Sequence, residues 1–582
     1  MVNALKSAKT PTALDSVTIT YGLLSLPTAQ HKAGLAGLLL QIQSMIDRKL
    51  LGEHIPEIIG DVSATSVTIR FTEQSVCGLL NDVYAATVEE ARVKAKWPKQ
   101  TPKREEVVEE LDPETKKVSK TKYFVYDVIQ PTGHFLRQHL QNDEGGRWHK
   151  LWRDMLWQIP RGKPTTRGPY NAAAEGGPCV EGQRAWKDLQ AYSKAQKSGA
   201  FKTSEISSAL LLGAQAINAE RVAFLGQVEQ TLLLHFWPLT ILIFVPQQID
   251  NDGNSEFVGF SLAIPEVSNL LQFCEKYPKL LHQKDAAKRG YRPAGAVIDI
   301  PQQSALEFMS HLASLVQDSS GLQLKRLGVV SVEYMHLVKQ GNNVKTMASG
   351  RIGADANLLD TYWREASPVN SLYRNPLFRS AILLALLKQT SWWTGFENML
   401  QNRPWPFFVR CEKTPRNLSW FATDVAKKFE QSLDDYRSDL RLQAEYPSMN
   451  SSESGSSTDR LPVLIHRLVS NYVNRKTEEK SGVKWDSFKD KKVTDDKSGK
   501  ERTDVPKEYR DAREKVVSDA FLAMRSRRDQ DFADYFTASI CSVGQFLRSD
   551  EKADEFSVVA SALLNRRDDV KTLTLLALSA NS

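Results

Sequence analysis

The chain has 582 residues, more than one hydrophobic core normally serves, which excludes a one-core domain and favours two to four structural units. Hydrophobic residues make up 41% of the chain and charged residues 25%, the composition of an ordinary globular protein. The net charge of +7 and the pI near 8.9 are a mild basic excess that favours an anionic partner without proving one.

Cysteine usage and hydropathy indicate the compartment. The five cysteines are far apart and form no CxxC pair, which disfavours a disulfide framework or a structural zinc site and fits a reducing cytoplasm. The N-terminal stretch MVNALKSAKT lacks the apolar core of a signal peptide. The most apolar run, residues 231–245, is too short to span a bilayer and is expected to be buried core. We therefore expect a cytoplasmic protein with no membrane segment.

The first elements alternate between strand and helix. "SVTITYGLL" and "SATSVTIRFT" are rich in β-branched residues and predict strands, whereas residues 29–47 and 73–95 have helical periodicity. This order is half of a ferredoxin-like βαβ arrangement, which many unrelated proteins share. Residues 97–127 then alternate charge and valine around an Asp-Pro-Glu-Thr turn and predict a long, protruding, solvated hairpin. Neither segment indicates a function.

A basic window follows from residue 147 to residue 203, with eleven lysines and arginines against four acidic residues. Its centre is "IPRGKPTTRGPYN", residues 159–171, where three prolines stiffen the backbone. The expected contacts to phosphates and bases are Arg161, Lys163, Arg167, Tyr170 and Asn171. The alternative, a proline-rich surface turn with solvated charges, stays open. Trp148 and Trp152 just upstream are spaced for a helix face and are expected in the core.

The region 204–410 supplies core strands and apolar helices, and it contains a second candidate site. In "HLVKQGNNVKTMASGR", residues 336–351, a tight turn joins two strand-like runs. The side chains expected to contact nucleic acid there are Asn342, Asn343, Lys345 and Arg351. Most such turns have no binding role, and that alternative also stays open.

Composition changes at residues 447–460, a Ser-rich segment of linker type. Residues 461–582 then show repeated helical periodicity and predict a bundle of four or five helices. The predicted fold class is therefore α+β: a mixed N-terminal and central region, residues 1–446, with a ferredoxin-like βαβ start, followed by a C-terminal helical bundle.

Enzyme signatures are missing from the sequence. It contains no GxxxxGK, HExxH, GxSxG or GxGxxG motif, so we predict no catalytic residue, no metal site and no cofactor. Two alternatives remain: a metal-dependent nuclease or other nucleic-acid-processing enzyme whose acidic residues meet only in the fold, and a structural scaffold with an incidental basic patch.

Three segments together resemble a known family: "LSLPTAQHKAGLAGLLLQIQSM" near the N-terminus, "IPRGKPTTRGPYN", and "VEYMHLVKQGNNVKTMASGRI". They are similar to the large subunit of type I CRISPR Cascade complexes, and most of all to the Myxan-type branch of subtype I-B. The resemblance implies a non-catalytic subunit that contacts the crRNA 5′ handle, recognises the protospacer-adjacent motif (PAM) on double-stranded target DNA and helps open the duplex for R-loop formation, while base pairing supplies the remaining specificity.

The resemblance also implies partners: the crRNA, the target DNA, and the backbone, handle-binding and small subunits. A helicase-nuclease or, in transposon-borne systems for RNA-guided transposition, a transposition adaptor would act downstream. In related systems the C-terminal helices are also made separately from an internal start codon as the small subunit. Met449, in the Ser-rich segment, is the candidate start here.

Overall fold

The structure is a computed structural model. It describes residues 16–98, 100–111, 118–140, 146–214, 224–284, 287–318, 321–322, 326–367, 372–445, 459–494, 501–542 and 550–582. The chain forms two compact units: unit 1 comprises residues 1–246 and 258–359, and unit 2 comprises residues 247–257 and 360–582. The predicted linker 447–460 lies almost entirely outside the described residues, as does Met449, so the predicted domain division stays a prediction.

Unit 1 opens with the predicted strand-helix-strand-helix order. The elements are β1 (Val17–Gly22), α1 (Ala29–Asp47), β2 (Glu57–Ile58), β3 (Ser66–Phe71) and α2 (Glu73–Val83). Both helices start at threonine caps: Thr28 Oγ1 accepts from the His31 backbone N–H, and Thr72 forms a reciprocal capping box with Ser75. The strands form an antiparallel sheet in the order β1-β3-β2. The ferredoxin-like assignment of this start stays a prediction.

The helix predicted over residues 73–95 is wrong beyond Val83. Residues 86–93 instead form strand β4 (Ala86–Val93), which pairs with β6 (Val118–Pro131) so that Ala86 lies opposite Pro131. The helical pattern of α2 depends on its buried apolar residues, and none of the β4 residues is buried. Strand pairing satisfies the backbone of this solvated stretch, and its β-branched residues Thr87, Val88 and Val93 favour that geometry.

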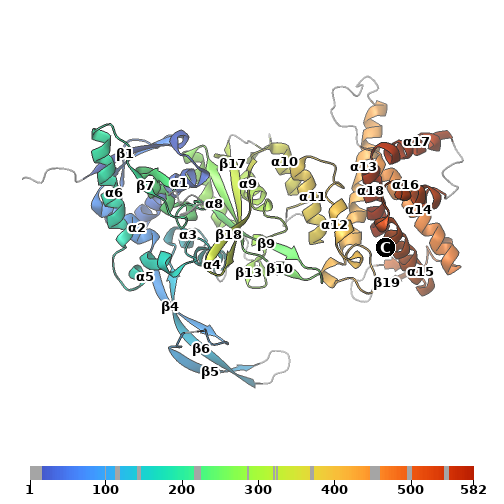
Figure 1. Cartoon of the computed structure of the whole chain (residues 1–582), viewed down its shortest axis with the longest axis horizontal. Coiled ribbons are helices and arrows are strands. Elements are labelled where there is room, and N and C mark those ends of the chain that lie inside the picture. The colour runs from blue at the N-terminus through green and yellow to red at the C-terminus, as the bar shows by residue number, and fades with distance from the viewer. Residues whose placement is uncertain are drawn as a thin grey trace, which may run out of the picture. The chain divides into compact units, whose positions relative to one another are not determined.

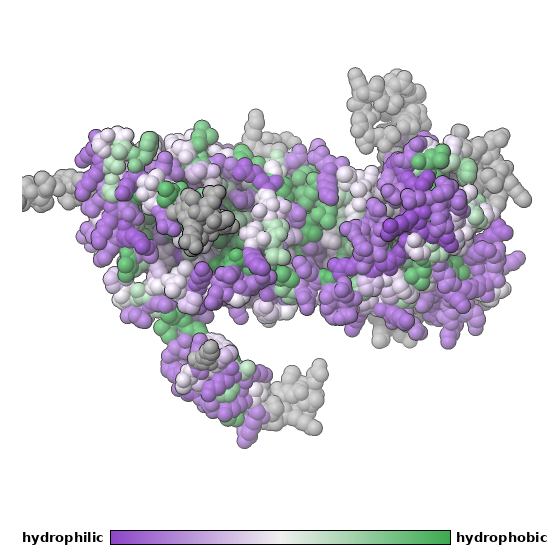
Figure 2. Space-filling model, in the orientation of Figure 1, coloured by the Kyte–Doolittle hydropathy of each residue, from purple (hydrophilic) through white to green (hydrophobic). Residues whose placement is uncertain are grey.

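The strands β4, β6 and β5 (Arg104–Leu111) form a three-stranded sheet in the order β4-β6-β5, here called the ribbon. Figure 1 shows the ribbon extending away from the rest of unit 1, and Figure 2 shows that its surface is mostly hydrophilic. The predicted hairpin at 97–127 is thus confirmed, with β4 as a third strand that the sequence analysis assigned to a helix. Residues 112–117 lie outside the described part of the chain.

The largest sheet supports the core of unit 1. Its long strands are β9 (Leu242–Ile249), β11 (Phe260–Val267), β17 (Val329–Gln340) and β18 (Asn343–Gly353), in that spatial order. Helix α1 packs against β11, where Lys32 Nζ lies 2.8 Å from Glu266 Oε1. The apolar run 231–245 is buried along nearly its whole length, as predicted.

Shorter elements complete unit 1. They are α3 (His134–His139), α4 (Arg147–Gln158), α5 (Gly168–Ala174), α6 (Val180–Lys197), β7 (Thr203–Glu205), β8 (Leu225–Gln227), α7 (Val228–Thr231), α8 (Leu270–His282), β12 (Lys288–Arg289), β13 (Arg292–Pro293), β14 (Val297–Ile298), α9 (Gln303–Ser314), β15 (Gln317–Asp318) and β16 (Gly321–Leu322). Trp148 and Trp152 on α4 are 6% and 3% exposed, so their predicted place in the core is confirmed.

Unit 2 is predominantly helical. Its elements are β10 (Ser255–Phe257), the end of α10 (Ala356–Glu365), α11 (Pro376–Lys388), α12 (Glu397–Asn402), α13 (Phe421–Glu445), α14 (Leu461–Ser481), β19 (Lys492–Thr494), β20 (Glu501–Thr503), α15 (Lys507–Ser526), α16 (Asp529–Tyr535), α17 (Asp550–Asn565) and α18 (Arg567–Ala580). The C-terminal helix α18 is buried over most of its length because α13, α14 and α15 pack around it. The predicted mixed fold with a helical C-terminal region is confirmed, and α13, which precedes the predicted bundle in sequence, also packs on it.

Candidate nucleic-acid interface

The basic loop 159–171 begins where α4 ends. Its backbone is tight: a Cβ on Gly162 would lie 2.8 Å from the Gln158 carbonyl oxygen, so only glycine fits there. Pro164 starts a 3-10 turn over Pro164–Arg167, which leads directly into α5. Proline is favoured at the first position of such a turn because it lacks the N–H that would have no partner there. Gly162 and the prolines thus restrict the backbone conformations open to this loop.

Arg161 points into unit 1 and is only 9% exposed. Its Nη2 donates to Tyr84 Oη at 2.7 Å, and its Nη1 donates to the Ala209 carbonyl at 3.4 Å. Tyr84 Oη also lies 2.6 Å from His235 Nδ1. Because arginine can only donate, the tyrosine hydroxyl accepts from Arg161 and donates to a neutral His235. Burial, with Arg161 nearby, lowers the pKa of His235 to about 3, which agrees with a neutral ring.

Tyr170 is also covered. It is 3% exposed, and its ring makes edge-on contacts with Tyr84 and Trp157 at centroid distances of 5.0 and 5.2 Å. Burial raises the pKa of its hydroxyl to about 12. In this structure Arg161 and Tyr170 therefore hold the loop against the core, and their side chains are not presented to a ligand. The expected contact of both side chains with nucleic acid stays a prediction, and their burial counts against a direct contact.

The rest of the loop reaches solvent. Lys163 is exposed, and Asn171 is half-buried. Arg167 lies over the Trp157 ring at 4.8 Å, and its Nε and Nη2 donate to the carbonyls of Arg161 and Trp157 at 2.9 and 3.0 Å. Half-burial lowers the pKa of Arg167, but a guanidinium stays charged. Lys163 is thus the most accessible cation of the loop, and Arg167 is held by carbonyls.

The second candidate, the β17–β18 hairpin, presents its turn. Gly341 has a φ of +61°, the left-handed geometry that a two-residue hairpin turn requires. Asn342, Asn343 and Lys345 are exposed, and Lys345 forms no ion pair with a described residue. Arg351, farther along β18, is exposed but lies 3.1 Å from Glu266 Oε2. The loop follows α4 and the turn joins β17 to β18, so the two basic segments belong to different elements of unit 1.

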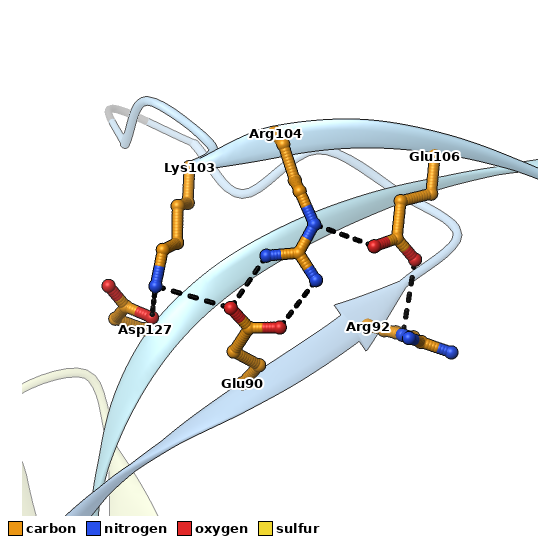
Figure 3. Close-up of polar contacts among 6 residues, drawn as sticks. All are labelled: Glu90, Arg92, Lys103, Arg104, Glu106 and Asp127. Atoms are coloured by element: carbon orange, nitrogen blue, oxygen red, sulfur yellow. Dashed lines mark hydrogen bonds and ion pairs between the residues drawn. The ribbon is translucent and has the colours of Figure 1, made fainter.

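The ribbon carries charges that neutralise one another. Six side chains on one of its faces are linked by ion pairs, as Figure 3 shows: Glu90, Arg92, Lys103, Arg104, Glu106 and Asp127. Arg104 makes a two-pronged contact with Glu90 at 2.6 and 2.5 Å. Hydrogen bonds from Arg104 and then Lys103 lower the pKa of Glu90 to about 2. The three cations of this face are therefore balanced by three carboxylates, and the face presents no excess cation to phosphates.

A metal site does not emerge from the described residues. Among them, no group of three or more His, Cys, Asp and Glu side chains is placed to hold a metal ion. The described cysteines are all free thiols, and no helix in the described ranges is long and apolar enough to cross a membrane.

Comparison with protein families decides the relationship. The model of the type I-B CRISPR Cas8b N-terminal domain matches residues 55–321, and the model of the Cas8b C-terminal domain matches residues 329–581. The chain belongs to the Cas8b family of type I-B CRISPR systems. It is thus a Cascade large subunit of subtype I-B, as the resemblance implied. None of the curated proteins matches the chain. The basic loop lies in the Cas8b N-terminal match and the β17–β18 hairpin in the C-terminal match.

One exposed aromatic side chain of this Cas8b chain is not among the contacts predicted from the sequence. Tyr291, in the turn between β12 and β13, is 63% exposed. Lys150 Nζ and the Arg292 guanidinium lie over its ring at 6.0 and 4.9 Å. An exposed ring flanked by cations is a common contact for nucleic acid. The sequence signal, "RGYRP", is short, and only the fold brings Lys150 from α4 beside it.

The role given to Tyr84 leads to a stability prediction. We expect Tyr84→Phe to destabilise unit 1 by about 2 kcal/mol, because it leaves Arg161 Nη2 and His235 Nδ1 buried without a partner. The midpoint of urea unfolding, followed by intrinsic fluorescence, measures the effect. Tyr436→Phe is the control, since its hydroxyl makes no hydrogen bond with a described residue. An unchanged midpoint for Tyr84→Phe would contradict the buried network.

Proposed function

We propose that the chain is the non-catalytic large subunit that recognises the PAM on duplex DNA, contacts the crRNA 5′ handle and helps open the duplex for R-loop formation. The observation that carries the proposal is the match of both Cas8b domains within one chain. Specificity beyond the PAM then comes from guide pairing, so the protein needs only a few base contacts and a positive surface for phosphates.

The hairpin turn and the basic loop make different contacts with nucleic acid. Asn342 and Asn343, exposed at a hairpin turn, have amide groups that can donate to and accept from base edges. Lys345 beside them supplies charge for phosphates. In the loop, Lys163, Arg167 and Asn171 make the handle or motif contact. The buried pair Arg161 and Tyr170 acts indirectly, by fixing the loop.

Two further groups of side chains contact nucleic acid. Tyr291 with Lys150 and Arg292 forms a stacking contact near α4. Arg351, paired with Glu266, stays charged and contacts phosphate from the strand β18. The proposed partners are the crRNA, the target DNA, and the backbone, handle-binding and small subunits, within the cytoplasm.

We also propose a branch of the family, a downstream partner and an internal start codon. We assign the chain to the Myxan-type branch, with a helicase-nuclease or, in a transposon-associated system, a transposition adaptor acting after target binding. Met449 is proposed as the internal start of a small subunit that comprises residues 449–582. Helices α14 to α18 would make up that product, and they share one hydrophobic core.

Reconstitution tests the function. The full chain is expressed with the backbone and handle-binding subunits and a repeat-bearing RNA, purified, and offered a duplex library with a randomised motif next to a guide-matched sequence. We expect a complex that contains the RNA and selects a short motif, and that loses this selection without the large subunit. Magnesium- or manganese-dependent cleavage of DNA by the purified chain alone would instead support the nuclease alternative, and a chain without salt-dependent affinity for DNA or the RNA would support the scaffold alternative. A complex that selects the motif equally well without the chain would contradict the proposed function.

Removing Lys163 and Lys345, the exposed lysines of the basic loop and of the hairpin turn, is expected to weaken this binding by about tenfold. In Lys163→Ala/Lys345→Ala, two phosphate contacts are lost, so the salt dependence of duplex affinity should also flatten, by roughly 2 in the log-log slope. Fluorescence anisotropy of a labelled PAM duplex on the assembled complex, across a salt series, measures both quantities. Lys279→Ala is the control, because this exposed lysine is paired with Glu275 at 2.7 Å. Equal salt-dependence slopes for the double variant and the wild type would show that neither lysine contacts the DNA.

A further inference from the structure

An exposed tryptophan with a stacked arginine lies in unit 2. Trp420, the residue before α13, is 41% exposed. The Arg374 guanidinium lies 4.3 Å from the centre of its ring. An indole face and a guanidinium plane both stack on nucleobases. The pair thus presents a planar cationic surface to solvent.

Further cations surround the Arg374–Trp420 pair. Lys427 Nζ donates to the Leu372 carbonyl at 3.0 Å, and Arg410 Nη2 donates to Thr423 Oγ1 at 3.1 Å. Arg374, Arg410 and Lys427 form no ion pair with a described carboxylate, because their described partners are neutral oxygens and the indole ring. Their positive charge is therefore available to an anionic ligand.

Asp424, four residues after Trp420 on α13, is an acid whose carboxylate accepts backbone N–H groups. Asp424 is fully buried, and its Oδ2 accepts the backbone N–H groups of Arg374 and Asn375 at 2.7 and 2.6 Å. Asn375, also fully buried, caps α11 and donates from Nδ2 to the Leu418 carbonyl at 3.0 Å. These bonds tie the backbone beside Arg374 to the segment that leads to Trp420. The surface is consequently rigid before any ligand arrives, which reduces the entropy lost on binding.

We propose that Trp420 and Arg374 bind a single strand of nucleic acid, with one base stacked on the pair and the neighbouring phosphates held by Arg410 and Lys427. A duplex covers its base faces by stacking, so only an unpaired strand can use the aromatic surface, whereas phosphates alone would need no tryptophan. The inference rests on the proposed function for the source of that strand, since duplex opening releases one. It concerns a different surface from the loop and the hairpin.

Alanine at Trp420 is expected to weaken single-strand binding about tenfold. The probe is a fluorescein-labelled oligodeoxythymidylate, titrated with the full chain and read by anisotropy, beside a duplex of the same length. Trp420→Phe should recover most of the affinity, and duplex affinity should change less than about twofold. Trp485→Ala is a matched control: Trp485 is also 41% exposed, but its ring contacts Phe488 and Tyr509 instead of an arginine.

Other outcomes overturn the proposal. Unchanged affinity of Trp420→Ala removes the site, and equal losses for single strand and duplex reduce it to a general phosphate contact. Competition by an acidic peptide as strong as that by the oligonucleotide indicates a protein partner instead. If Trp420→Ala fails to fold, as judged by its melting curve, Arg374→Lys decides the matter: it keeps the charge but loses the planar group, and it should also weaken single-strand binding.

The two proposals fail separately. Weaker PAM-duplex binding with a flatter salt slope in Lys163→Ala/Lys345→Ala, but intact oligodeoxythymidylate binding, supports the proposed function without bearing on Trp420. Intact oligodeoxythymidylate binding by Trp420→Ala removes the Trp420 site and leaves the proposed function in place.

Discussion

Replacing Gly34 by alanine is expected to destabilise unit 1 by about 3 kcal/mol, although alanine favours a helix over glycine by about 1 kcal/mol. Gly34 lies on α1 at the point where the 3-10 turn Leu232–His235 packs against the helix. A Cβ at this position would collide with the carbonyl oxygen of Leu233 and lie 2.8 Å from its carbonyl carbon. Backbone atoms cannot move aside as a flexible side chain can, so either α1 or the buried run 231–245 has to shift.

Urea unfolding followed by intrinsic fluorescence measures this effect. Gly37→Ala should behave similarly, because its Cβ would meet the Phe236 carbonyl on the next turn of the same contact. Gly52→Ala is the matched control, since nothing lies within 4 Å of the added carbon and its φ is not in the left-handed range. A Gly34→Ala variant as stable as Gly52→Ala would show that α1 does not pack this closely on the buried run.

The elements that the sequence predicts well are those whose pattern is decided by their own burial. Helix α1 is rich in apolar residues, is buried on nearly every side and has the bounds expected, 29–47, with a threonine cap at its start. The prediction over strand β4 was wrong for the opposite reason. Its charged, largely exposed residues bury no apolar face, so pairing with the distant strand β6 decides its conformation and overrides the local helical pattern.

The candidate site shows the same limit. Arg161 and Lys163 are two residues apart in one basic loop, yet one is buried and the other exposed. The difference comes from Tyr84, which is hydrogen-bonded to His235 and meets Arg161 only after folding. Charge density in the sequence therefore located the loop but could not say which cations face solvent. Trp420 was missed because Arg374, its partner, lies on another element.

The pH dependence of stability provides the second large effect, and it centres on Lys284. This lysine follows α8 and is 6% exposed; its Nζ has no hydrogen-bond partner among the described residues and lies 5.0 Å from the centre of the Trp148 ring. Burial lowers the pKa of Lys284 from 10.5 to about 7, and the nearby Glu307 opposes the shift. His311, paired with Glu307 at 3.2 Å, faces the same place, and burial lowers its pKa as well.

Between about pH 7 and 10.5 the unfolded chain keeps the Lys284 proton while the folded chain loses it, so the free energy of unfolding rises with pH, by at most about 1.4 kcal/mol per unit. Below about pH 7 both states are protonated and the penalty is constant. We expect Lys284→Met to be more stable than the wild type near neutral pH, and the difference to shrink by about 1 kcal/mol over one pH unit above pH 7.5. Lys279→Met, at an exposed position of α8, should keep the wild-type dependence. Urea unfolding at a series of pH values measures all three proteins, and parallel curves for Lys284→Met and the wild type would mean that Lys284 keeps its proton in the folded protein. The lowered pKa of His311 lies below this pH window, so the stability difference between Lys284→Met and the wild type reports on Lys284. The buried ammonium of Lys284 lies beside Trp148, a residue of α4, the helix that leads into the basic loop.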